Sequence, residues 1–106
     1  MEQENIPFAI NVQTDAGNST VVNVNIKGDL SFSTVPAAYE QTKNSFGEGQ
    51  HIRFDLNNVQ RADSAAMALI LEWHRLAKEH NSQITLLNVP VMLKNIASVT
   101  DLEELL

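Results

Sequence analysis

The side chains that could perform chemistry are few, and most lack the spacing that a metal centre needs. His74 and His80 are six residues apart, which places them on different faces of a helix. His51 stands at the entrance of a strand-like segment, away from the other two. The chain contains no cysteine, so thiolate catalysis and cysteine metal sites are excluded. We therefore expect no metal ion.

The acidic side chains do not predict catalysis either. Asp55 and Asp63 flank one polar segment, but an acid directly before a helix is typical of a helix cap rather than of proton transfer. The sequence has no glycine-rich phosphate loop and no Gly-x-Ser-x-Gly nucleophile motif. We expect a protein that is not an enzyme and that has no cofactor.

Ser64 is the remaining reactive group, and the residues around it allow two interpretations. It follows Asp63 at the start of a long apolar segment, so either side chain could cap the first N–H groups of a helix. Its hydroxyl could instead bind a partner or accept a phosphate. The positive helix N-terminus favours the added charge by about 0.3–1 kcal/mol. Asp63 would oppose it, and an apolar interface would desolvate it, so a phosphate on Ser64 is expected to disrupt docking.

The segment after Ser64 predicts an amphipathic helix with an unusual first half. One face collects the residues expected in the core: Ala66, Leu69, Ile70, Trp73, Leu76 and Ala77. The opposite face begins with Ser64, Ala68 and Leu71, has Met67 at its border, and becomes charged only from Glu72 onward. Contiguous apolar surface on a soluble protein usually marks a contact site, so this half-helix is predicted to bind a partner. The predicted partner-binding residues are Arg61, Asp63, Ser64, Ala65, Met67, Ala68, Leu71 and Arg75.

Two alternatives to a partner could also cover that apolar face. The first is the chain's own amphipathic tail at residues 102–106, and the second is another copy of the chain, which makes a homodimer possible. Removing the tail separates the first from a true partner, because loss of folding on truncation would mean that the tail covers the helix.

The remaining pattern predicts the elements that position this helix. Alternating apolar residues indicate strands at 8–12 and 22–26, joined by a short turn and hence antiparallel. A turn at 28–32 leads to a helix from Ser33–Thr34 to Phe46, then a strand at 52–56, a polar loop and the long helix. A strand at 83–87 and a helix opened by Pro90 follow. Helices between consecutive strands imply right-handed parallel crossovers, so we expect one α/β domain over 1–106, with helices packed on a mixed four-stranded sheet.

Charge and hydropathy exclude several partners. Thirteen acidic against seven basic residues give a net charge of −6, which disfavours nucleic acid and an anionic membrane surface. The longest apolar run, 65–71, is far shorter than the roughly 20 residues of a membrane span. The acidic segment at 1–5 is unlike the basic head of a signal peptide. We expect a cytoplasmic protein without direct membrane insertion.

Several motifs in the sequence resemble those of a known family. The stretches Ile52–Val59 and Asp63–Leu69 resemble the signature of STAS domains, the fold of anti-sigma-factor antagonists and of the cytoplasmic tails of sulfate transporters. Residues 28–30 and 34–36 are similar to the family's second-strand exit and first helix. Within the family, residues 68–73 and the ending from Pro90 to Leu106 are most similar to the MlaB group.

The resemblance implies two functions. Similarity to the MlaB group implies a subunit that binds and supports the ATPase of an ABC phospholipid transporter of the Mla type, peripheral to the inner membrane through that complex. Similarity to the antagonists implies the alternative, an anti-sigma-factor antagonist. Ser64 stands at the family's Ser/Thr position, so in that alternative its phosphorylation would be the switch.

Overall fold

The predicted succession of strands and helices is present in the computed structural model, which describes residues 7–106. The helices and strands in chain order are β1 (Ala9–Thr14), β2 (Val21–Leu30), α1 (Val35–Thr42), β3 (His51–Ala62), α2 (Ser64–Glu79), β4 (Gln83–Leu87) and α3 (Val91–Thr100). Two 3-10 turns, η1 (Lys43–Ser45) and η2 (Glu103–Leu105), follow α1 and α3. The acidic segment at 1–5 lies outside the described residues.

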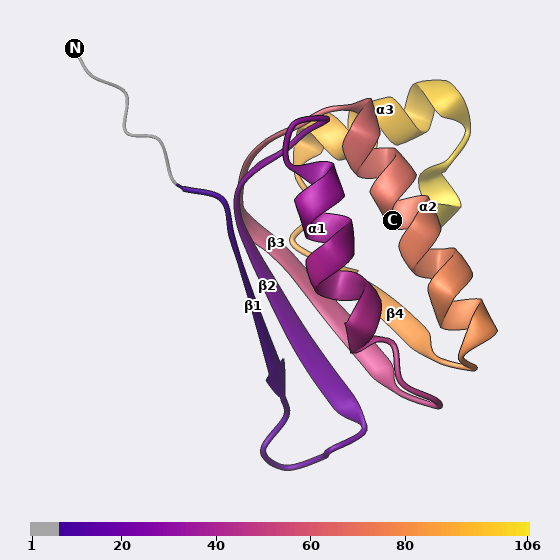
Figure 1. Cartoon of the computed structure of the whole chain (residues 1–106). Helices are drawn as coiled ribbons and strands as arrows, with labels where there is room; N and C mark the ends of the chain where they lie inside the picture. Colours follow the sequence, from indigo (N-terminus) through magenta and orange to yellow (C-terminus); the bar gives the residue numbers. More distant parts are fainter. Residues whose placement is uncertain (1–6) are drawn as a thin grey trace.

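The four strands form one mixed sheet in the order β1-β2-β3-β4. β1 is antiparallel to β2, while β3 runs parallel to both of its neighbours. This is the predicted topology, with a helix on each parallel crossover. Figure 1 shows α1 and α2 running across one face of the sheet, and α3 packs beside α2. On the opposite sheet face, no helix of residues 7–106 lies over β1 and β2 (Figure 1).

Two of the predicted boundaries are wrong because the strands pair further than their side chains suggest. Gly28–Leu30, predicted as part of a turn, continues β2, and the predicted polar loop after Leu56 continues β3 to Ala62. The two extensions pair with each other from Lys27↔Asn58 to Leu30↔Ala62. Register shifts there disturb the alternation of apolar residues. Parallel pairing supplies hydrogen-bond partners for the backbone N–H and C=O groups, so these segments form strands although many of their side chains are polar.

The first helix is shorter than predicted. α1 ends at Thr42, and residues 43–45 form η1 before the buried Phe46. The hydroxyl of Thr42 donates to the carbonyl of Ala38 one turn earlier, at 2.7 Å. This bond gives an acceptor to the O–H of a side chain that is buried in the core.

A single aromatic and hydrogen-bonded cluster joins α1, α2 and β3. The six residues predicted as the core stripe of α2 are all buried. Among them, Trp73 stacks on Phe54 of β3 with ring centroids 3.8 Å apart and planes 10° apart. Its indole Nε1–H donates to the hydroxyl of Thr42, 2.9 Å away. The cluster fixes α2 rigidly against the sheet, so the residues on the outer side of α2 are held in place.

Candidate docking surface at the start of the long helix

The side chain of Asp63, and not that of Ser64, caps α2. Asp63 is in the extended region, and its Oδ1 accepts a hydrogen bond from the N–H of Ala65 at 2.9 Å. Ser64 is the first helical residue, so its interpretation as the cap is wrong. Its exposed hydroxyl makes no hydrogen bond within residues 7–106. The hydroxyl is therefore free to meet a partner or a modifying enzyme.

The second oxygen of Asp63 brings a residue from outside the predicted partner-binding set to this helix end. Oδ2 accepts a hydrogen bond from the N–H of Phe32 at 3.2 Å, across the connection between β2 and α1. Thr34 closes that connection, since its hydroxyl donates to the carbonyl of Asp29 at 2.7 Å and accepts from the N–H of Ser31 at 3.0 Å. Phe32 is 79% exposed. One sequence feature could have indicated that Phe32 is exposed: it stands between two serines in a predicted turn, where polar residues are usual.

An exposed stripe continues from this point along α2. Ser64, Ala68 and Leu71 lie about one turn apart on the outer side of the helix, and Leu71 is 51% exposed. Together with Phe32 they form what we call the docking face: Phe32, Ser64, Ala68 and Leu71. Large exposed side chains at two of these four positions give the face its apolar character. The cap of α2 holds the backbone of Phe32 beside the first turn of the helix, so the two elements that carry the face are tied to each other.

Met67 was predicted to contact a partner, but the structure buries it. Its side chain is only 4% exposed and belongs to the core cluster. The reason is that α3 and η2 pack along that flank of α2, so the core extends further around the helix than one stripe. Ala65 is partly buried, which leaves it at the margin of the docking face.

The two predicted arginines do not join the docking face as free charges. Arg61 lies on β3 next to the buried Ala62, and its side chain leaves the opposite face of the sheet. Arg75 is exposed on the stripe, but its guanidinium binds Glu72 at 2.8 Å and Glu79 at 2.7 Å. The hydrogen bond from Arg75 holds the pKa of the Glu72 carboxyl below its usual value and raises the pKa of the guanidinium. At neutral pH this cluster carries one net negative charge.

The chain's own tail does not cover the docking face, so that alternative is wrong for these residues. Leu102, Leu105 and Leu106 pack partly buried against the core. His74 Nε2 donates to the carbonyl oxygen of Leu105 at 2.8 Å, which ties the tail to the flank of α2. Leu71 remains half exposed with the tail in this position.

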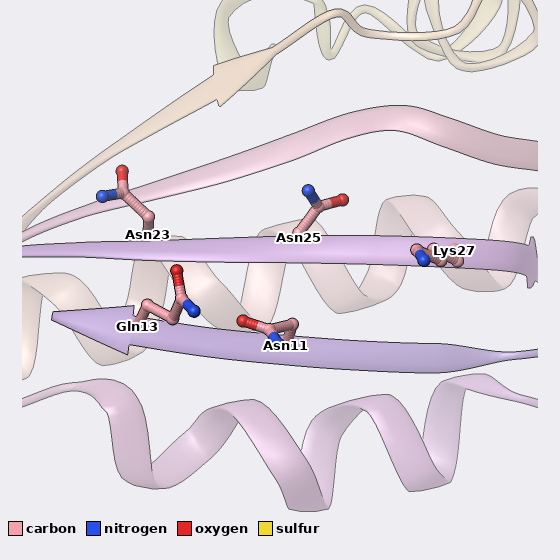
Figure 2. Close-up of a pocket in the computed structure, with 5 residues that line it drawn as sticks. All are labelled: Asn11, Gln13, Asn23, Asn25 and Lys27. Carbon is pink, nitrogen blue, oxygen red and sulfur yellow. The ribbon is translucent and has the colours of Figure 1, made fainter. Parts of the chain in front are cut away.

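Three further features of residues 7–106 concern metal binding, a surface groove and helix length. Among residues 7–106 no three His, Asp or Glu side chains lie close enough to hold a metal ion. A shallow groove of about 330 Å³ lies on the helix-free face of the sheet. Figure 2 shows its lining residues: Asn11, Gln13, Asn23, Asn25 and Lys27. None of the described helices is long and apolar enough to cross a membrane.

Comparisons with known proteins agree with the fold. The chain resembles a Thermotoga maritima protein described as "a putative anti-sigma factor antagonist", with a TM-score of 0.75, 15% identity and coverage of 90% of this chain and 80% of that one. It also resembles part of the murine anion transporter Slc26a9, with a TM-score of 0.65, 18% identity and coverage of 76% of this chain and 14% of the transporter. At these identities the likeness shows the fold alone. No curated protein sequence matches the chain.

The sequence itself matches a family over most of its length. The family described as "Mlab, STAS domain" matches residues 13–106, a range that holds both the extended β2–β3 pair and the whole of α2. The chain therefore belongs to the STAS domain family, in its MlaB-type branch.

Proposed function

We propose that the chain is a non-enzymatic binding subunit that docks on the ATPase of an ABC phospholipid transporter of the Mla type. The observation that carries the proposal is the docking face itself. Leu71 and Phe32 are 51% and 79% exposed, although Leu71 lies on the well-packed α2 and the backbone of Phe32 is bonded to the cap of that helix. Exposed apolar side chains on rigid elements favour binding, because little conformational entropy remains to be lost. Membership of the MlaB-type family supports the choice of partner.

The charges around the docking face define the complementary surface. The apolar residues meet the Glu72–Arg75–Glu79 cluster one turn further along α2, and the whole chain has a net charge of −6. A partner surface with an apolar centre and a basic rim would match both features. In this proposal the chain is cytoplasmic and reaches the inner membrane only through the ATPase.

Co-expression tests the proposal. A tagged copy of the chain and the untagged transporter ATPase of the same cell are expected to purify together as a stoichiometric complex. ATP hydrolysis by the ATPase is expected to be higher in the complex than for the ATPase alone. If the chain elutes free while the ATPase is present in excess and folded, the proposed partner is wrong.

A specific observation also favours a second function, that of an anti-sigma-factor antagonist switched by phosphorylation. The hydroxyl of Ser64 is exposed, unbonded within the described part of the chain, and placed at the positive end of α2. In this function the chain isolated from its own cells is expected to show the added mass of one phosphate, and Ser64→Ala is expected to lose it. An unmodified mass through growth, starvation and stationary phase would contradict the switch.

A further inference from the structure

β1 is an edge strand without the features that usually protect an edge. It is the outermost strand in Figure 1, with no described helix or strand beyond it. Its sequence, Ala-Ile-Asn-Val-Gln-Thr, contains no charged residue, glycine or proline. Protected edges carry lysine, proline or a bulge, which prevent another strand from pairing with them. The edge of β1 is therefore available for pairing.

The hydrogen bonds of the hairpin show which backbone groups face outward. Asp15 N–H donates to the carbonyl of Val21 at 2.8 Å, and these two residues extend the β1–β2 register by one position beyond Thr14↔Val22. Hydrogen-bonded pairs alternate along antiparallel strands, so Ala9, Asn11 and Gln13 direct their backbone groups to β2. The backbone groups of the intervening residues then face the open edge. These outward residues are Ile10, Val12 and Thr14.

We propose that β1 pairs antiparallel with β1 of a second copy, about a two-fold axis at Val12. The three outward residues are spaced symmetrically about Val12, so one register satisfies all of their N–H and C=O groups. In that register Val12 pairs with the partner's Val12, and Ile10 pairs with the partner's Thr14. The result is a continuous eight-stranded sheet built from two four-stranded sheets.

The side chains on both faces of β1 fit a second copy. On the helix-covered face, Val12 is 45% exposed and borders an open groove of about 440 Å³ against the end of α1 and η1. The partner's Val12 would contact it there. On the other face, Asn11 and Gln13 project from β1 beside the groove (Figure 2). In the proposed register Asn11 would lie opposite the partner's Gln13, where their amides can hydrogen bond across the axis. No charged side chain from residues 9–14 meets its own copy, although each chain carries a net charge of −6.

This interface is separate from the docking face. β1 lies at one edge of the sheet, whereas the docking face stands at the start of α2 and on the connection between β2 and α1. The proposal therefore does not rest on the identity of the docking partner, and either one can fail alone. An extended peptide of another protein could use the same edge, and the experiments below distinguish the two occupants because they use the purified chain only.

Cysteine cross-linking tests the register, since the chain has no cysteine of its own. Opposite residues of a hydrogen-bonded antiparallel pair have Cα atoms about 5.5 Å apart, which is within the range of a disulfide. Val12→Cys is therefore expected to form a covalent dimer on mild oxidation. Ala9→Cys is the matched control, because its two copies would be about 20 Å apart along the strand. A dimer formed equally by Ala9→Cys, or none by Val12→Cys at high protein concentration, would overturn the proposal.

Sedimentation of the unmodified chain tests the association itself. The expected result is a rise from the monomer toward twice the monomer mass as concentration increases. Val12→Pro is expected to abolish this rise and to leave the far-ultraviolet spectrum unchanged, because its N–H faces outward and takes no part in the β1–β2 ladder. Asn11→Pro, which removes an N–H directed at β2, is expected to destabilise the hairpin. A monomer at all concentrations would refute the dimer, as would association that Val12→Pro leaves intact.

Discussion

Leu71→Glu is expected to weaken binding to the proposed ATPase partner by about 30-fold or more. A central apolar contact in an interface contributes about 2 kcal/mol when it is truncated, and 1.4 kcal/mol corresponds to a factor of ten. Glutamate adds the penalty of desolvating a carboxylate in the interface. Leu71 is the most suitable position because it is half exposed and lies on the first half of α2 with Ser64 and Ala68.

The variant is expected to fold normally, so the loss of binding can be interpreted. Position 71 faces solvent, and a glutamate there would lie one turn before Arg75, an arrangement that slightly stabilises a helix. Circular dichroism and the melting temperature should match those of the parent. The matched control is Val99→Glu, which makes the same kind of change at an 85% exposed position on α3. Equal binding by the parent and Leu71→Glu would exclude α2 as the docking element.

Phe32→Ala provides an independent measure of the same surface. Phe32 is 79% exposed and contributes only its backbone N–H to the contact with Asp63, so the substitution removes the ring and keeps that hydrogen bond. Binding is expected to weaken, with no change in stability. If Leu71→Glu fails to bind while Phe32→Ala binds fully, the interface extends along α2 and does not include the β2–α1 connection.

Trp73→Ala is expected to have the largest effect on stability, a loss of about 3–5 kcal/mol in the free energy of unfolding. The side chain is fully buried, stacks on Phe54 and donates its indole N–H to Thr42. Removing it leaves a cavity between α2 and β3 and removes a donor that holds α1. Since small domains are stable by only about 5–15 kcal/mol, the variant is expected to be partly unfolded at physiological temperature. Urea denaturation followed by circular dichroism measures the difference.

A second variant separates the hydrogen bond from the cavity. Thr42→Val keeps the volume of the side chain but leaves the indole N–H of Trp73 unsatisfied, at a cost of about 1–3 kcal/mol. Thr100→Val is its control. Thr100 makes the same hydroxyl-to-carbonyl bond one turn back, to Ile96, but at an exposed position. If the two threonine variants lose equal stability, the buried bond to Trp73 has no special role.

The parts of the fold that depend on side-chain periodicity were predictable. The core stripe of α2 repeats at helical spacing, and all six of its predicted residues are buried. The apolar alternation of residues 22–26 and 52–56 similarly places them in strands. The extensions of β2 and β3 were not predictable in this way. They form because two distant polar segments pair their backbones, and a single sequence carries no direct signal for such pairing.

In the candidate site too, some features follow from local side-chain periodicity and others depend on contacts between distant segments. Ala68 and Leu71 could be assigned to the exposed side from spacing alone, and the structure leaves both exposed. The burial of Met67 depends on α3 and η2, whose positions a helical wheel cannot supply. Phe32 joins the surface only through a hydrogen bond to a residue 31 positions later. Contacts between segments distant in sequence therefore decide the edges of the site, while its centre follows from local pattern.

One carboxylate sets the geometry of the docking face without belonging to it. The two oxygens of Asp63 hold the N–H groups of Phe32 and Ala65, and so fix the separation between the aromatic side chain and the helix. Affinity can then be adjusted indirectly through Asp63, because a change there would alter the alignment of Phe32 with the start of α2. Related chains that differ there could select different partners with the same apolar residues.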